Sequence, residues 1–143
     1  MRYLVCAAAL LLATACSSVE PLPIRAGDTC ERCRRTITDT RLAGEMITTT
    51  GLAVKFRTVE CMAKYLQDHP ERVRVVYVTD YPTGRMLIAG NAVFVRKTID
   101  EATKERDYLA FRNLKDAIKA GSDAGFNPID WLAVRQVVGA ATN

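Results

Sequence analysis

Two stretches of this chain, 55 residues apart, repeat the same order of residue types, and this repeat limits the folds available to it. Residues 56–64 read FRTVECMAK and residues 111–119 read FRNLKDAIK, with Phe, Arg and Lys identical. Thr58 and Asn113 fall at the same place, and both are residue types that cap the N-terminus of a helix. A repeat of this period is typical of a supersecondary unit used twice. Because the match is short, a chance similarity is the alternative.

The residues around the first copy predict a ββαβ unit. Two runs rich in β-branched residues are broken at Gly51, which indicates a hairpin. Apolar residues at helical spacing follow, and Pro70 ends them. The expected elements are, in chain order, a strand over 45–50, a strand over 52–56, a helix over 59–69 and a strand over 73–79.

The second copy predicts a similar unit with less regular flanks. The expected elements are strands over 86–88 and 92–96, a short strand over 108–111 and a helix over 114–120. The apolar segment 129–138 fits a strand over 129–134, by analogy with the first unit, or a helix over 130–138. The charged run 100–107 is predicted to be an exposed loop or a helical turn. The predicted fold class is therefore α+β, with two sequential ββαβ units over about 44–80 and 85–135.

The first 16 residues, MRYLVCAAALLLATAC, predict a secretory leader. Arg2 precedes an apolar run too short to span a bilayer. Small residues then lead to Cys16, as in a bacterial lipobox, so we expect residues 1–16 to be a lipoprotein signal peptide with Cys16 as the lipidated N-terminus. An ordinary signal cut near Ala15 is the alternative. Ser17 is not an Asp-type retention signal, which favours the outer membrane in a Gram-negative host.

The rest of the chain predicts one domain on a membrane tether. Residues 17–27 are small and Pro-bearing, which indicates a flexible tether. Residues 28–138 are long enough for a single core, and residues 139–143 form a tail. Of 20 basic and 16 acidic residues, only Arg2 lies in the leader, which leaves a net charge of +3. This mild charge, without interleaved aromatic residues, does not indicate nucleic-acid binding. No hydrolase motif is present, which argues against hydrolysis.

Because Cys6 and Cys16 belong to the predicted leader, the domain itself contains three cysteines. Cys30 and Cys33 form a C-x-x-C pair among three arginines, and positive neighbours favour the thiolate form. Cys61 falls in the first turn of the expected helix, away from its apolar face, where the helix dipole also favours a thiolate. Three thiols on a small chain outside the cytoplasm predict either a soft-metal site or one disulfide with an odd cysteine.

Several chemistries fit these thiols. Thiolates select Cu(I) because the ion is soft, and a Met sulfur or His69 is a possible further ligand. Zinc would need a fourth ligand, and His69 lies about two helical turns from Cys61. A reversible Cys30–Cys33 disulfide, or a static bridge beside an inert Cys61, are the metal-free alternatives. His69 also fits a helix end, and Met46 and Met86 fit the core better than a metal site.

The sequence resembles the NosL family of copper-binding lipoproteins, which are accessory proteins of nitrous oxide reductase. The resemblance spans roughly residues 28–135 beneath a lipoprotein leader. The matching pieces are Cys30-x-x-Cys33; a strand over 52–56 running into Val59-Glu60-Cys61-Met62; Tyr77-Val78-Thr79-Asp80-Tyr81-x-Thr83-Gly84; Asn91-Ala92-Val93-Phe94-Val95; and Ala110-Phe111. The family has two ββαβ units, and the organomercurial lyase is its distant structural relative.

The resemblance implies Cu(I) binding on the periplasmic face of a membrane and delivery of copper to the reductase. An ABC-type transporter complex and a copper-receiving enzyme would be the partners, and the protein would be a metallochaperone. The chain departs from the family pattern C-x-x-C-G-M, because Arg34 and Arg35 follow Cys33. Residues 104–107 also lack the family's Pro-Met-Gly stretch. A guanidinium does not bind copper. The expected site is therefore the three thiols Cys30, Cys33 and Cys61, and the alternative is a divergent member with another metal or another role.

Overall fold

The first repeat folds in the predicted order. The structure, a computed structural model, describes residues 19–141, so the predicted signal peptide and the lipidated Cys16 lie outside the described residues. The elements of this repeat are β1 (Gly44–Thr48), β2 (Ala53–Phe56), α1 (Val59–Asp68) and β3 (Val73–Thr79). The turn between the first two strands holds Gly51 at φ 86°, a conformation that favours glycine. The predicted hairpin, helix and strand are confirmed.

The first sheet has the strand order β2-β1-β3-β4, with all neighbours antiparallel. β1 is central, because Met46 faces Val54 on one side and Val76 on the other. β4 (Met86–Ile88) extends this sheet beyond β3 and does not belong to the second one. Short 3₁₀ turns complete the connections, namely η1 (Thr40–Leu42), η2 (Pro70–Arg72) and η3 (Ala89–Asn91).

The second repeat has the same plan with one shortened edge. Its elements are β5 (Val93–Asp100), β6 (Glu105–Phe111) and α2 (Leu114–Ala124). β5 pairs with β6 on one side, and on the other Phe94 forms an isolated bridge with Ile129. Ile129 thus takes the place that β3 takes beside β1. The α+β class and the two sequential units are confirmed, with the last strand of the second unit reduced to this bridge.

The prediction of an exposed loop or a helical turn over 100–107 holds only for residues 101–104. β5 continues to Asp100 and β6 begins at Glu105, so the turn of the hairpin is confined to residues 101–104. Asp107 is 3% exposed. The charges fit inside a strand because other parts of the fold neutralise them: Glu105 pairs with Arg57, and Asp107 accepts a hydrogen bond from a helix amide.

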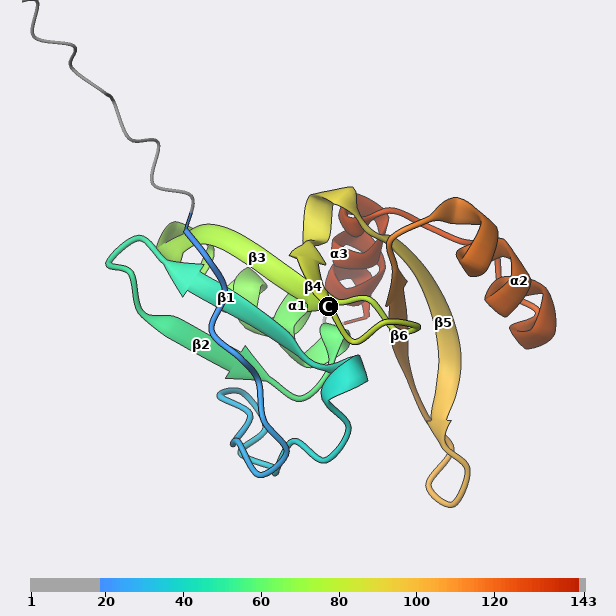
Figure 1. Cartoon of the computed structure of the whole chain (residues 1–143), viewed down its shortest axis with the longest axis horizontal. Helices are drawn as coiled ribbons and strands as arrows, with labels where there is room; N and C mark the ends of the chain where they lie inside the picture. The colour runs from blue at the N-terminus through green and yellow to red at the C-terminus, as the bar shows by residue number, and fades with distance from the viewer. Residues whose placement is uncertain (1–18, 142–143) are drawn as a thin grey trace, which may run out of the picture.

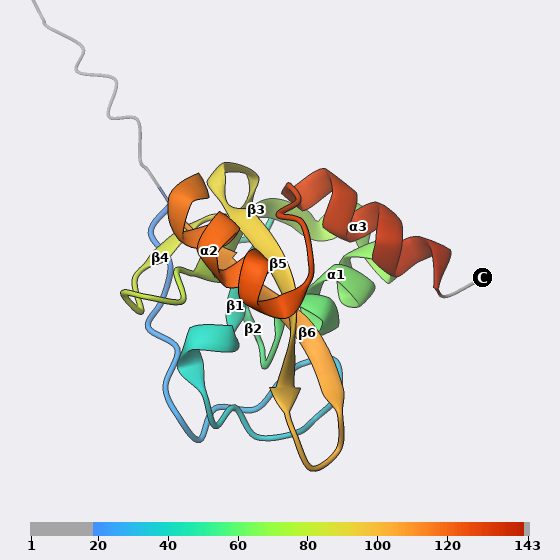
Figure 2. The same ribbon diagram turned by 90° about the vertical axis from the view of Figure 1, so that its right-hand side faces the viewer.

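The last apolar segment is a helix, α3 (Trp131–Ala140), which confirms the helical alternative. The side chain of Asp130 caps it by accepting from the Ala133 amide at 2.8 Å. Figure 2 shows α3 lying beside α1. The Gln67 side chain joins the two helices by donating to the Arg135 carbonyl at 3.2 Å.

The buried apolar side chains form two clusters, one on each side of the β5–β6 ribbon. Helices α1 and α3 pack against the sheets in the main core, and α2 packs on β5 away from that core (Figure 1). The largest buried apolar side chains of the main core include Met46, Phe56, Met62, Leu66, Phe94, Tyr108 and Val134. The second cluster consists of Val95, Leu109, Phe111 and Ala117. The β5–β6 ribbon is therefore covered on both faces, which holds β6 rigidly beside α1.

Buried Asp80 joins the two sheets. It forms a parallel bridge with Ala110 of β6. Its carboxylate accepts from the Arg112 amide at 2.8 Å, and the Tyr81 amide donates to the Ala110 carbonyl at 2.8 Å. These bonds set the position of the second repeat relative to the first.

Residues 19–27, predicted to be part of a flexible tether, are held on the first sheet. Figure 1 shows this segment crossing β1 and β2. The Leu22 amide donates to Glu45 at 2.8 Å, the Tyr77 hydroxyl donates to the Val19 carbonyl, and Lys55 donates to the Pro23 carbonyl at 2.9 Å. Within residues 19–141, none of the helices has the length and apolar character needed to cross a membrane.

Candidate metal centre

Cys30 and Cys33 lie in a tight loop ahead of the first repeat. The Arg34 amide donates to the Cys30 carbonyl at 3.0 Å, and the Cys30 amide donates to the Arg35 carbonyl at 2.9 Å. Arg34 adopts φ 59°, a left-handed conformation that favours glycine. The loop is fastened to β2 because the Glu31 amide donates to the Lys55 carbonyl at 2.9 Å. Both thiols are thereby placed beside the end of β2.

Cys61 lies in the first turn of α1, as predicted. The Thr58 hydroxyl caps this helix by accepting from the Cys61 amide at 3.3 Å. The expectation that Cys61 stays out of the core is wrong, because it is 9% exposed and belongs to the main cluster. Helical spacing places Cys61 off the apolar face, but the Cys30 loop covers that side of the helix.

The fold brings the three predicted thiols together. The sulfur atoms of Cys30, Cys33 and Cys61 all lie within 4.8 Å of one another, and all three thiols are free. Cys30 is fully buried and Cys33 is half-buried. An ion bound equally by three sulfurs at about 2.3 Å would hold them about 4 Å apart, so the cluster fits a soft metal with little rearrangement.

The environment of Cys30 favours its thiolate. A hydrogen bond from the Cys61 thiol is the largest cause, and it lowers the pKa of Cys30 to about 4 against the opposing effect of burial. The backbone amides of Cys33 and Arg57 also donate to this sulfur. The pKa of Cys61 is raised, first by its hydrogen bond to Cys30 and then by burial. Of these two coupled thiols, Cys30 is therefore the one whose thiolate form is favoured.

His69, the imidazole candidate, lies away from the thiol cluster. His69 ends α1, at the opposite end from Cys61, and its ring packs on Tyr65 with centroids 4.3 Å apart. Met46 is buried in the core, as predicted, and Met86 belongs to β4. Zinc in a closed site takes four protein ligands, and the group found among the described residues has three.

The two places where the chain departs from the NosL pattern now have structural roles. Arg35 is 60% exposed and donates to Glu105 at 3.4 Å. Asp107 accepts from the Glu60 amide at 2.9 Å, so it lies at the N-terminus of α1. Sequence reasoning missed Asp107 and Arg57 as neighbours of the site. Arg57 directly precedes the helix cap, which could have indicated it, whereas only the tertiary fold brings in Asp107.

A small cavity opens onto the thiols. It measures about 170 Å³, and both Cys33 and Cys61 line it. Its other walls are mostly charged and consist of Arg32, Arg35, Thr58, Glu60, Lys64, Glu105, Arg106 and Asp107. Cys30 does not line it, so the cluster is reached from the side of Cys33 and Cys61.

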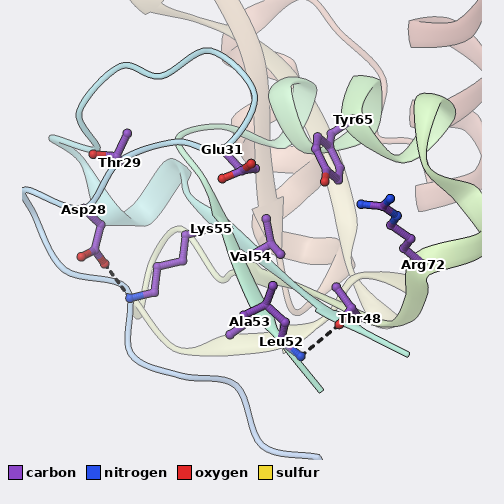
Figure 3. A pocket seen from close by; sticks show the side chains of 10 residues that line it. All are labelled: Asp28, Thr29, Glu31, Thr48, Leu52, Ala53, Val54, Lys55, Tyr65 and Arg72. Atoms are coloured by element: carbon purple, nitrogen blue, oxygen red, sulfur yellow. Dashed lines mark hydrogen bonds and ion pairs between the residues drawn. The ribbon is translucent and has the colours of Figure 1, made fainter. Parts of the chain in front are cut away.

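A larger cavity, about 420 Å³, lies on the β2 side of the same loop and contains no thiol. Figure 3 shows Glu31 and the Lys55–Asp28 ion pair among its lining residues. Lys55 Nζ lies 2.7 Å from Asp28 Oδ2, so the most prominent charges here are already paired. Size alone therefore does not locate the metal centre.

Comparison with known proteins bears on the fold. No protein-family model matches the chain, and no curated protein matches its sequence. The crystal structure of the copper chaperone NosL from Shewanella denitrificans is similar with a TM-score of 0.67 and 19% identity, over 80% of this chain and 94% of that one. The chain has the NosL fold. The predicted resemblance is confirmed at the level of structure, and the thiol cluster lies within this NosL-like domain.

Proposed function

We propose that this protein binds Cu(I) through Cys30, Cys33 and Cys61 and hands it to a copper-receiving enzyme. The observation that carries the proposal is the approach of all three sulfurs to within 4.8 Å of one another. Thiolates favour Cu(I) over harder ions because sulfur and Cu(I) are both polarizable. The similar fold of a copper chaperone supports this choice of metal.

The layout of the site suits transfer rather than permanent storage. Cys30 is buried behind the other two thiols, while Cys33 and Cys61 line a cavity open to solvent. An incoming ligand from the receiving protein would therefore meet the metal beside Cys33. We infer that Cys33 is exchanged first during delivery and that Cys30 releases the metal last.

The cellular setting follows from the leader and the family resemblance. We propose a lipoprotein anchored through Cys16 on the periplasmic face of a membrane, with the outer membrane expected in a Gram-negative host. The proposed recipient is nitrous oxide reductase or a related cuproenzyme, with an ABC-type transporter complex as partner. We propose a metallochaperone and not an enzyme.

One observation favours a second candidate function, thiol–disulfide exchange. A low pKa makes Cys30 a thiolate at neutral pH, and thiolates are the species that attack disulfides. The burial of Cys30 argues against this role, because an attacking sulfur needs access to its substrate. A disulfide-reductase assay with the reduced protein separates the two functions.

The decisive experiment is an anaerobic Cu(I) titration of the reduced full chain in detergent, against a competing chelator. We expect tight binding of one Cu(I), and a loss of about 100-fold or more in Cys30→Ser, Cys33→Ser and Cys61→Ser. His69→Ala is the matched control and should bind like the unchanged protein, because His69 lies at the far end of α1. Binding that survives Cys33→Ser would refute the assignment.

A further inference from the structure

Arg57 contacts the thiol cluster in two ways. It lies between the end of β2 and the cap residue Thr58. Its backbone amide donates a hydrogen bond to the Cys30 sulfur, and its guanidinium donates one to the Cys33 sulfur. The guanidinium also lies close enough to interact with the charge of Cys61. The side chain thus places a permanent positive charge against Cys33 and near Cys61, while the backbone amide serves Cys30.

This guanidinium is held in place from its other side. It pairs with Glu105 of β6, and its side chain is only 14% exposed. Its Nε is buried without a hydrogen-bond partner in the described structure. The charge therefore cannot turn away into water, in contrast to that of Arg35, which is 60% exposed.

A fixed cation beside a three-thiolate site acts differently on ions of different charge. Three bound thiolates carry three negative charges, so the Cu(I) form has a net charge of −2 and a Zn(II) form has a net charge of −1. An adjacent positive charge stabilises the more negative form more strongly. The effect is largest where the charges are partly buried, as they are at Arg57.

We propose that Arg57 is a specificity-determining residue, which makes this site prefer a monovalent over a divalent thiophilic ion by offsetting the extra negative charge of the Cu(I) form. The inference rests on the proposed function, because it takes the three thiols as ligands. Arg57 positions and balances the ligands and does not bind the metal itself.

The test measures the ratio of Cu(I) to Zn(II) affinity of the full chain in detergent, each metal titrated against a chelator. Arg57→Gln should lower this ratio about 10- to 100-fold, the size expected for one charge interaction in a partly buried site. Arg57→Lys keeps the charge and should restore most of the ratio. Arg112→Gln is the matched control, because Arg112 holds the same place in the second repeat, and it should leave the ratio unchanged.

A second variant keeps the test valid if Arg57→Gln does not fold. Glu105→Gln removes the negative charge that opposes the guanidinium, so it should raise the Cu(I) to Zn(II) ratio. A fall in that ratio would overturn the proposal. So would an Arg57→Gln protein that loses both metals equally, because this is the result of a structural role.

Failure of the proposed function gives a different result. If the unchanged protein binds no Cu(I), the function and the inference both fall. If it binds Cu(I) tightly and the ratio is the same in Arg57→Gln and Arg57→Lys, only the role of Arg57 falls.

Discussion

The N-terminal turns of α1 and α2 are built alike and surrounded differently. Each helix follows the last residues of a strand, begins after a capping side chain and is preceded by arginine. Cys61 of α1 corresponds to Asp116 of α2 at the repeat offset of 55. Cys61 is buried under the Cys30 loop, whereas Asp116 bonds only to its own cap residue, Asn113.

The difference shows that the repeat determines the local backbone structure, whereas the segments packed against it determine the chemical environment of the helix N-terminus. A helix N-terminus favours a negative group, and the first turns of α1 and α2 contain Glu60 and Asp116. Only the first repeat has an additional loop on one side and a strand of the other repeat, β6, on the other. The segment preceding the second repeat forms β4 and η3 instead.

The largest expected effect comes from exchanging the paired positions for alanine. Cys61→Ala should lower Cu(I) affinity about 100- to 1000-fold, because one of three ligands is lost. Asp116→Ala should leave Cu(I) affinity unchanged and should cost at most about 1 kcal/mol of stability. Chelator competition and urea unfolding measure the two quantities. Equal copper affinities in the two variants would contradict the claim that this position binds metal in the first repeat and not in the second.

The contact between Asp107 of β6 and the N-terminus of α1 can be tested by measuring the free energy of unfolding as a function of pH. Burial, opposed by hydrogen bonds from Thr58 and two amides, raises the pKa of Asp107 to about 6 from 3.8. The folded protein therefore binds this proton more tightly than the unfolded chain. Its free energy of unfolding should fall as pH rises from about 4 to 6, by about 2–3 kcal/mol in total.

Asp107→Asn is the control for this titration. Urea unfolding across the same pH range should show a shallower slope in the variant, since the two proteins differ only in the group at position 107. Leu52 of the first repeat is the counterpart of Asp107 and is exposed and apolar, so this proton has no equivalent in the first repeat. Identical slopes would mean that Asp107 is ionised in the folded protein well below pH 6.

The two helix caps should differ in strength. Thr58 is buried, and its hydroxyl serves both the Cys61 amide and Asp107, whereas Asn113 is exposed. Thr58→Ala should cost about 2 kcal/mol, because two polar groups lose a partner, and Asn113→Ala about 0.5–1 kcal/mol. Thermal or urea unfolding of the metal-free variants measures both. A larger cost for Asn113→Ala would contradict the comparison.

The smallest effect concerns the loop that only the first repeat possesses. Arg34 adopts a left-handed backbone conformation, at φ 59°, where glycine has no steric penalty. Arg34→Gly should therefore stabilise the protein by about 0.5 kcal/mol, since the exposed ion pair with Glu31 contributes little. Unfolding measurements check the sign, and Arg32→Gly in the same loop is a control without positive φ. Destabilisation by Arg34→Gly would show that the ion pair matters more than the backbone.

Local patterns in the sequence determined most of the fold. Gly51, Pro70 and the two cap residues act through bonds within their own segments, so the hairpin and both helix starts were predictable. The strand structure within the charged run 100–107 was not predictable, because charged residues indicate exposure unless partners distant in the sequence neutralise them. Those partners, Arg57 and the α1 amides, come from the other repeat.

The sequence by itself also determined which three thiols are available and which residue types surround them. Only the tertiary structure decided that they meet. Cys30 and Cys61 are 31 residues apart, and their approach depends on the Cys loop fastening to β2 and on α1 starting directly after that strand. Local propensity cannot predict this approach, because the approach depends on the packing of segments that are far apart in the sequence.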